Sequence, residues 1–443
     1  MATLATNEFN AALKIAYLDP LNDNVVRKTV ILDRLQKNSE DVSGQHAYVA
    51  LISARNPGVG SRADTAGTGP TLPEAGNQTY TQATFKMTYH YGRAQISGPA
   101  MRASKNNKNA FAKAMEVEME GLSSVLPEDL NRQLWSYGHG RAATLAAAAT
   151  AGATQVTVSS TSIFGAKVGD RIHFSSITAG ALVGNANNTV SAISRDTNST
   201  SHLVSLSGTT GSALTVGTTG IYFGSGASAV QTTRGNDMMG IPAAVDDGAV
   251  GADELSAAEA GEIQGGLNFG GIARTASSFW SCQMMQNPAG AGTNRPLTNS
   301  LLQQAFLTQT TIGGADQKSI EAYTNPGIWG TWGLLHIGDR RYSDYQDTLE
   351  GGWMFLKFNG IKVFYDRDCP RDIIWFLDMS KLMFLTQSGY EFMEEDGSIF
   401  SRVSGVDAYE FTLYRDCQIG MKMGKCHLRL DDISSNSNIE ANV

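Results

Sequence analysis

The chain has 443 residues, of which 42% are hydrophobic and 17% charged, and its formal net charge is −8. This composition excludes a largely disordered chain and suits two or three domains around a sizeable core. The longest apolar runs, such as residues 373–377, are far shorter than the roughly 20 residues of a membrane helix, and residues 1–10 lack the basic and apolar regions of a signal peptide. We therefore expect a globular protein that is neither exported nor inserted into a membrane.

The charge is unevenly distributed along the chain. Up to Lys108, twelve basic residues stand against eight acidic ones, which leaves a net charge of −12 for the remainder. Opposite signs in two parts of one chain suit head-to-tail contact between copies, although ordinary solvated charge explains the count about equally well. A protein that recognises nucleic acid would need a denser stripe of basic residues with aromatic residues between them, and the sequence has no such stripe.

The first 100 residues predict an arm followed by a long hairpin. Residues 1–44 are mostly polar, with one apolar run at 25–35, and are expected to form an extended arm with a short strand or turn. Two β-prone segments follow at 46–52 and 85–91, joined by a long segment rich in Gly and Pro. Alternation places four side chains of the second segment on one face: Phe85, Met87, Tyr89 and Tyr91. Because a two-stranded ribbon is marginal alone in water, we expect it to rest on another protein surface, such as a second copy of the chain.

A helical pattern begins at Asn106. Phe111, Met115, Met119 and Leu122 recur at helical spacing, which predicts a long amphipathic helix with an apolar stripe in the core. We expect this helix to end before Pro127 and a second short helix to follow.

Residues 142–230 are rich in Ala, Gly, Ser and Thr and hold five short β-prone runs, at 155–158, 171–174, 189–193, 203–206 and 221–223. Their regular spacing between turn residues favours a small separate barrel or sandwich over low-complexity disorder.

The rest of the chain predicts a mixed α/β region and closing strands. We expect helices after Pro296 and at 339–349, and strands at 353–358 and 360–365 joined at Asn359-Gly360, a strong tight-turn signal. Further strands are expected at 373–378, at 383–385 and within 390–433.

The sequence contains no recognisable catalytic motif. Its seven histidines fit no HExxH pattern, and neither a GxSxG nor a phosphate-loop motif is present, so we expect neither an enzyme nor a cofactor. The four cysteines lack paired spacing, which favours buried reduced thiols over a metal site. Asp366 and Asp368 could bind a cation, but a turn at a strand end explains them at least as well.

This order of elements resembles the major capsid proteins of tailed bacteriophages, which have the Hong Kong 97-type fold. Four segments carry the resemblance: FKMTYHYGRAQISGPAMRAS at 85–104, EMEGLSSVLPEDLNRQLWSYGHG at 118–140, GIKVFYDRDCPRDIIWFLD at 360–378 and FTLYRDCQIGMKMGKCHLRLDDI at 411–433. The resemblance covers nearly the whole chain apart from residues 142–230. That segment looks like the insertion domain that some relatives carry.

The resemblance implies an α+β fold with six parts. They are an N-terminal arm (1–44), an extended β-hairpin loop (45–98), a peripheral domain with a spine helix (99–141), an all-β insertion domain (142–230), an axial α/β domain (231–388) and the C-terminal peripheral strands (389–443). It implies self-assembly through pentamers and hexamers into the icosahedral head of a virion, built in the bacterial cytoplasm around double-stranded DNA held by weak, non-specific contact. Further partners implied are a separate scaffolding protein, a portal protein and a decoration protein.

The expected contacts between copies join the basic arm to acidic strands of a neighbour. The basic candidates are Arg55, Arg62, Arg93 and Arg102, and the acidic ones are Glu394, Glu395 and Asp396. The hairpin face of Phe85, Met87, Tyr89 and Tyr91 is expected to contribute apolar area. The loop 57–77 has no lysine, which disfavours the isopeptide cross-link of one branch of the family.

Two other functions fit part of the sequence. A protein nanocompartment of the same fold, similar to encapsulins, would enclose enzymes instead of a genome. A glycan-binding adhesin or tail protein would use residues 142–230 but would leave the hairpin unexplained.

Overall fold

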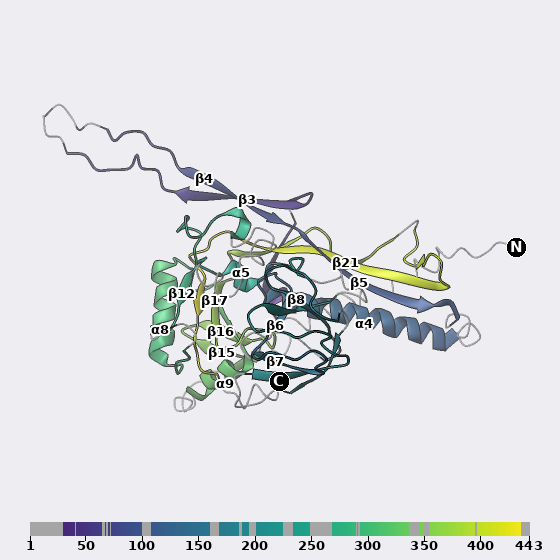
Figure 1. The fold of residues 1–443 in the computed structure, drawn as a ribbon. Coiled ribbons are helices and arrows are strands. Elements are labelled where there is room, and N and C mark those ends of the chain that lie inside the picture. Colours follow the sequence, from purple (N-terminus) through teal and green to yellow (C-terminus); the bar gives the residue numbers. More distant parts are fainter. Residues whose placement is uncertain are drawn as a thin grey trace.

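The computed structural model describes residues 30–39, 41–63, 67, 70, 72–99, 108–159, 168–185, 188–194, 201–224, 234–248, 268–288, 290, 293–335, 346–348, 354–394 and 397–435. A rounded body carries two extensions (Figure 1). A β-hairpin projects at the upper left, and a long helix with two strands alongside it extends to the right. Within the described part of the chain, no helix is both long enough and apolar enough to cross a membrane.

The predicted hairpin is present, but its returning strand begins earlier than the sequence indicates. Strand β3 (His46–Ala54) pairs antiparallel with β4 (Thr79–Lys86), and β2 (Val42–Ser43) adds a short third strand. After Met87 the chain enters β5 (Thr88–Ser97), which leaves the hairpin and pairs antiparallel with β21 (Ala408–Met421). The two predicted strands at 46–52 and 85–91 are therefore only partly members of one hairpin.

The long helix forms the right-hand extension together with β5 and β21, which belong to a six-stranded sheet. Helix α4 (Lys108–Leu134) runs through Pro127 as one element, so the prediction of two helices was wrong. Leu126, Leu130 and Leu134 are buried on both sides of the proline, and this packing offsets the lost backbone hydrogen bond. The sheet contains β5 and β21 with four shorter strands, β1 (Gln36–Asn38), β18 (Leu382–Thr386), β19 (Glu391–Phe392) and β20 (Ser401–Arg402).

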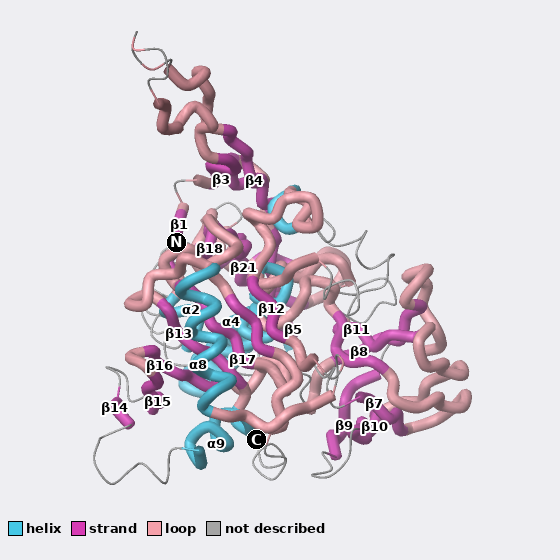
Figure 2. The backbone as a smooth tube through the Cα atoms, turned by 90° about the vertical axis from the view of Figure 1, so that its left-hand side faces the viewer, coloured by secondary structure: helices cyan, strands magenta, loops and turns pink. Residues whose placement is uncertain are grey.

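Residues 141–223 form a small barrel at the front of the body in Figure 1 and at the right in Figure 2. Its strands are β6 (Arg141–Thr144), β7 (Gln155–Ser159), β8 (Arg171–Ser176), β9 (Asn188–Ser194), β10 (Ser201–Leu206) and β11 (Thr219–Phe223), in the order β6-β11-β8-β9-β10-β7. A bridge between Leu145 and Val158 joins the two edge strands. The five strands predicted here are all present around an apolar core that includes Val158 and Phe174.

The centre of the body is a seven-stranded mixed sheet in the order β12-β22-β17-β13-β16-β15-β14. Its strands are β12 (Gln283–Met285), β13 (Ile320–Thr324), β14 (Gln346–Thr348), β15 (Met354–Phe358), β16 (Ile361–Tyr365), β17 (Ile374–Asp378) and β22 (Leu428–Leu430). Helices α8 (Asn299–Leu307) and α9 (Pro326–Leu335) contribute Leu302 and Trp332 to one core with this sheet. The shorter helices are α2 (Val30–Arg34), α5 (Ile241–Ala244), η2 (Phe269–Gly271) and the π-helix η3 (Thr308–Ile312).

Three local predictions need correction or fall outside the described residues. The short strand expected in the arm is present as β1 and β2, and helix α2, which was not predicted, precedes them. Gln346–Thr348 is a strand instead of the predicted helix, and the rest of 339–349 lies outside the described residues. Helix α9 has no counterpart among the predicted elements. The four cysteines are unpaired and buried, as expected.

Candidate inter-subunit surface

One face of the hairpin is anchored in the body. Ala47, Val49, Leu51, Ala83 and Phe85 alternate along β3 and β4 and are all buried. The ring of Phe85 meets the edge of Phe269 in η2 at a centroid distance of 5.2 Å. This contact joins the root of the hairpin to the body.

The opposite face of the hairpin exposes large apolar side chains. Tyr48, Ile52 and Tyr80 are 43%, 61% and 67% exposed. Ile52 and Tyr80 are direct cross-strand partners, so their side chains form one apolar strip with Tyr48 further down β3. No such strip is stable by itself in a two-stranded ribbon, which indicates a surface that becomes covered by a partner.

Beyond the strands the two chain segments stay close together. A Cβ atom added to Gly58 would lie 2.8 Å from the backbone nitrogen of Gly76, and the Asn56 side chain accepts a hydrogen bond of 2.8 Å from the Gly58 N–H. Val59 and Leu72, 83% and 88% exposed, lie in this outer part of the loop. Two more exposed apolar side chains therefore lie beyond the paired strands.

A second exposed surface lies on the sheet formed by β5 and β21. Tyr89 and Tyr91 point away from the core, and Tyr91 lies opposite Tyr414 of β21. The Tyr414 hydroxyl donates a hydrogen bond of 3.0 Å to Glu391, which raises the pKa of Tyr414. The other face of this sheet packs on α4, where a Cβ atom on Gly92 would lie 2.8 Å from Leu122 Cδ1.

Most of the predicted contact residues that the structure describes are exposed. Arg55, Arg62 and Glu394 are exposed, as are Tyr89 and Tyr91. Arg93 is exposed but forms an ion pair with Glu410 of the adjacent strand, so its charge is already partly balanced within the chain. Arg102, Glu395 and Asp396 lie outside the described residues.

Phe85 and Met87 are buried in the core, so the prediction that they face a neighbour was wrong. The alternation shifts by one residue where β4 ends and β5 begins, because Met87 and Thr88 are both buried in succession. The residues that do form the exposed apolar strip, Tyr48, Ile52 and Tyr80, were missed. The sequence held no clear signal for them, because β3 has apolar residues on both faces and Tyr80 lies ahead of the segment predicted as the returning strand.

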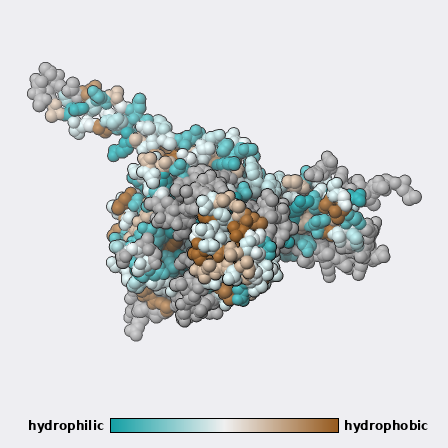
Figure 3. Space-filling model, in the orientation of Figure 1, coloured by the Kyte–Doolittle hydropathy of each residue, from teal (hydrophilic) through white to brown (hydrophobic). Residues whose placement is uncertain are grey.

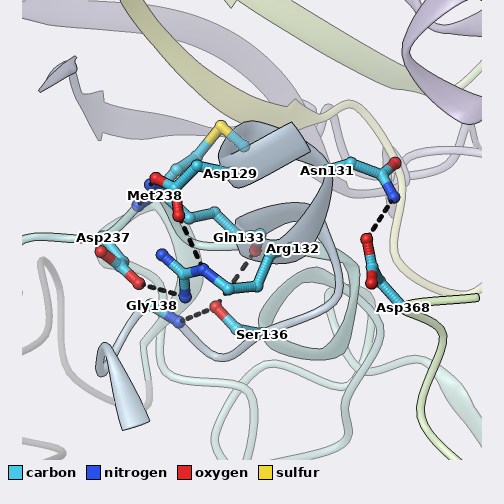
Figure 4. Close-up of polar contacts among 9 residues, drawn as sticks. All are labelled: Asp129, Asn131, Arg132, Gln133, Ser136, Gly138, Asp237, Met238 and Asp368. Carbon is cyan, nitrogen blue, oxygen red and sulfur yellow. Dashed lines mark hydrogen bonds and ion pairs between the residues drawn. The ribbon is translucent and has the colours of Figure 1, made fainter. Parts of the chain in front are cut away.

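A buried polar cluster holds the end of α4 to its surroundings (Figure 4). Arg132 lies between two carboxylates, donating hydrogen bonds of 2.8 Å to both Asp129 and Asp237. Its guanidinium also stacks 4.0 Å from the ring centroid of Phe223 in the barrel. Burial raises the pKa of Asp237 to about 6, although the Arg132 charge opposes this shift. The cluster thus joins the helix, the barrel and the segment 234–248 in one unit.

Asp366 and Asp368 belong to a turn on the other side of the same helix end. The Asn131 side-chain amide donates hydrogen bonds of 3.1 Å to Asp366 and 2.9 Å to Asp368, and the Asp368 N–H donates one of 2.9 Å to Asp366. Burial, and then the charge of Asp368, raises the pKa of Asp366 to about 6. The two carboxylates therefore accept hydrogen bonds within a turn, in line with the turn explanation given for them above.

No family model matches the sequence, and no curated protein is similar to it in sequence. The solved capsid of cyanophage A-1(L) superposes with a TM-score of 0.53 over 92% of this chain and 93% of that chain, at 14% identity. The chain therefore has the Hong Kong 97-type capsid fold, of the α+β class, as the resemblance predicted. A capsid subunit of the native GTA particle gives a TM-score of 0.43 at 10% identity, covering 92% of each chain. The SrpI encapsulin of Synechococcus elongatus gives 0.44 at 8% identity, covering 91% of this chain and 87% of that chain.

Proposed function

We propose that this chain is the major capsid protein of a tailed bacteriophage, which assembles through pentamers and hexamers into the icosahedral head around double-stranded DNA. The observation that carries the proposal is the likeness of fold to a cyanophage capsid subunit over nearly the full length of both chains. The projecting hairpin supports it independently, because a ribbon with an uncovered apolar face needs a partner.

The proposed division of the chain follows the family. Residues 1–44 would be the N-terminal arm, 45–98 the extended loop, 99–141 the spine-helix part of the peripheral domain, 142–230 the insertion domain, 231–388 the axial domain and 389–443 the closing strands. The bounds of the hairpin, of the long helix and of strands β7 to β11 support the second, third and fourth of these parts. The axial domains would surround the five-fold and six-fold axes.

The hairpin would act as the clamp between neighbouring subunits. Its apolar strip of Tyr48, Ile52 and Tyr80 would cover apolar surface on the next subunit, while Arg55 and Arg62 would meet acidic strands there, near Glu394. Each contact of this kind is heterologous and must close into a ring. Once one contact has formed, the others form at high effective concentration, so the shell is far more stable than any single pair.

The remaining partners follow from the same role. A scaffolding protein would be supplied separately, a portal protein would occupy one vertex, and a decoration protein would reinforce the shell. The packaged DNA would touch the wall only weakly, because the net charge of −8 opposes tight phosphate binding. The protein would assemble in the host cytoplasm and reside in the virion head.

The test is to express the chain in bacteria with and without the candidate scaffolding protein encoded beside it and to image the products by electron microscopy. Closed shells with five-fold vertices are expected. Nucleic acid inside particles isolated from the native source supports the viral role, whereas an enzyme cargo supports a nanocompartment. A monodisperse monomer at high concentration under every condition contradicts the proposal.

A glycan-binding role is less well supported by the barrel. Sugar rings usually stack on exposed aromatic side chains, and the aromatic residues of the barrel within its described part, Phe174, Tyr222 and Phe223, are buried.

A further inference from the structure

The returning strand of the hairpin has one free edge. Among the described strands, β4 pairs only with β3. The Lys86 C=O points away from β3, because it accepts a hydrogen bond of 3.1 Å from the Gln418 side-chain amide. Since backbone groups alternate in direction along an antiparallel strand, three further residues of β4 point the same way: Tyr80, Gln82 and Thr84. Within the described part of the chain, their backbone N–H and C=O groups have no hydrogen-bond partner.

Strand β5 has a free edge as well. Among the strands that the structure describes, it pairs only with β21, over its full ten residues. The Thr412 C=O of β21 accepts a hydrogen bond of 2.8 Å from the Met393 N–H on the far side, so Thr412 and its partner Arg93 turn their backbone groups away from each other. By the same alternation three further residues of β5 face the free edge: Tyr89, Tyr91 and Gln95. No described residue forms a hydrogen bond with these outward backbone groups.

Neither edge has the features that keep exposed strands from pairing with other chains. Natural proteins protect such edges with short strands, prolines, bulges or unpaired charges. Strands β4 and β5 have eight and ten residues without a proline, and the pairing of β5 runs without a bulge. Each has a single charged residue, Lys86 at the inner end of β4 and Arg93 of β5, which is already paired with Glu410. The outer edge of β3, by contrast, is shortened by β2 at one end and by an irregular register between Ile52 and Ala54 at the other.

The two free edges cannot pair with each other within one copy. Only Met87 lies between β4 and β5, whereas an antiparallel pair needs a turn of about two residues and a parallel pair a crossover of about a dozen or more. Figure 1 shows β4 in the hairpin at the upper left and β5 along the extension at the right. In Figure 3 both projections stand clear of the rounded body on the face in view. A partner for each edge therefore has to come from another molecule.

We propose that the free edge of β4 in one copy adds to the free edge of β5 in the next copy, so that the two subunits share one β-sheet. Each copy carries one edge of each kind on opposite sides, so a head-to-tail ring of copies leaves neither edge open. Two copies that paired β5 with β5 would instead leave every β4 edge unpaired. Strand addition of this kind gains its affinity from backbone hydrogen bonds. The two-stranded ribbon, which is marginal alone, becomes part of a larger sheet.

This inference rests on the proposed shell function and adds to it the way in which the hairpin holds its neighbour. Proline distinguishes backbone pairing from side-chain contact, because it lacks the N–H group but is compatible with a free strand edge. Gln82 and Gln95 are both exposed and face the two free edges, so each is replaced by Pro and, as a matched control, by Ala, which keeps the N–H group. Ala50→Pro is a second control, because Ala50, the cross-strand partner of Gln82, faces the outer edge of β3.

Gln82→Pro and Gln95→Pro should each raise the subunit concentration needed for shell formation by at least about tenfold, because the lost hydrogen bond recurs at every contact in the shell. Gln82→Ala, Gln95→Ala and Ala50→Pro should each assemble within about twofold of the wild-type concentration, as exposed substitutions outside a backbone contact do. Light scattering measures assembly, and thermal unfolding of the free subunits checks that each variant is folded.

Hydrogen exchange of the wild-type chain provides a second measurement that needs no substitution. The amides that face the two free edges, such as those of Gln82 and Gln95, should exchange at least about tenfold more slowly in particles assembled from the purified chain alone than in the free subunit, because they become paired. The Ala50 amide should keep its rate, because the outer edge of β3 stays unpaired.

The outcomes distinguish failure of the shared sheet from failure of the shell function. If no particles form under any condition, the proposed function fails and the shared sheet fails with it. If particles form but the edge amides exchange as in the free subunit, or the Pro variants assemble as well as the Ala variants, the shared sheet alone is refuted. Equal loss of assembly in the Pro and Ala variants would assign the contact to side chains, which also overturns it. Protection that appears only after a second protein is added would assign the edges to that protein and overturn the pairing between copies.

Discussion

Gly270 occupies the point where the root of the hairpin meets the body. Its φ of +64° is in the left-handed region, and a Cβ atom there would lie 3.0 Å from the Phe85 ring and 3.2 Å from Ala83. Gly270→Ala should therefore lower the free energy of unfolding by about 2–4 kcal/mol, from backbone strain and overpacking together. Denaturant unfolding of the subunit measures this loss.

Gly271→Ala provides the matched control. Gly271 has a similar φ of +75° but nothing lies within 4 Å of the added Cβ atom. It should cost only the strain, about 1 kcal/mol. Equal losses in the two variants would mean that the packing of Phe85 does not constrain Gly270.

His427 is a buried neutral histidine whose titration affects stability. Burial lowers its pKa to about 4, and its Nδ1 accepts a hydrogen bond of 3.2 Å from the Asp378 N–H. The neutral ring is favoured in the folded state, so its contribution to stability is complete above pH 6.5 and is lost as the pH falls towards 4. His427→Asn keeps an acceptor near the Nδ1 position and removes the titration.

The difference in unfolding free energy between wild type and His427→Asn should therefore shrink by about 2–3 kcal/mol between pH 7 and pH 4. Asp237 and Asp366 have raised pKa values and oppose this trend in the wild type, but both proteins contain them, so their effect cancels in the difference. Parallel stability curves over this range would refute the assignment. Thermal unfolding at a series of pH values provides the measurement.

At the scale of elements, the strands and turns with strong local signals were predictable. Asn359 and Gly360 have φ values of +49° and +81°, as a tight turn between β15 and β16 requires, and few residues other than Asn and Gly adopt them. Pro127 misled the prediction, because the burial of the residues around it could not be seen in the sequence. Helix α9 was missed because its sequence, PGIWGTWGLL, has two interior glycines and no polar face.

The faces of the hairpin show why tertiary pairing limits prediction from alternation. Lys86 pairs with His46 in the hairpin, whereas Thr88 pairs with Cys417 in a different sheet. The set of side chains that points into the core shifts by one residue where the partner strand changes from β3 to β21. A period of two from Phe85 to Tyr91 therefore puts two buried and two exposed residues on the same face. Packing against distant residues such as Phe269, almost two hundred residues away, decides which face is buried.

Neighbouring residues of β3 separate the structural role of the hairpin from its role in assembly. Ile52 is 61% exposed and Leu51 only 7%. Ile52→Ser should change subunit stability by less than about 1 kcal/mol, yet it should weaken assembly because it removes apolar area that a neighbour covers. Leu51→Ser should instead cost about 2–4 kcal/mol in stability, because it buries a hydroxyl in place of a packed side chain.

Thermal unfolding and light scattering of the two variants provide the comparison. If Ile52→Ser assembles at the wild-type concentration, the outer face of the hairpin is not a contact. If Leu51→Ser keeps wild-type stability, the inner face does not anchor the hairpin as described.

At the scale of the whole molecule, the sequence predicted the existence of a projecting arm better than the residues that make its contacts. Arg55 and Arg62 were placed correctly on the exposed loop because Gly and Pro surround them. The apolar strip of the hairpin could not be predicted, because β3 is apolar on both faces and its register with β4 selects the outer one.

The outer loop of the hairpin can be removed without disturbing the subunit. The backbones of Gly58 and Gly76 already touch, so deletion of residues 59–75 joins them directly as a Gly-Gly turn, a sequence that suits a tight hairpin connection. The shorter loop also costs slightly less closure entropy, so the melting temperature should stay the same or rise. Shell formation should be lost, since Val59, Arg62 and Leu72 are removed and the arm becomes shorter.

Replacing 59–75 by a Gly/Ser linker of equal length separates the effect of loop length from that of the side chains. Recovery of shells would assign the defect to length, and continued failure would assign it to these side chains. Normal shells from the deletion variant itself would show that the arm contributes nothing beyond its paired strands, and the clamp described above would then be wrong.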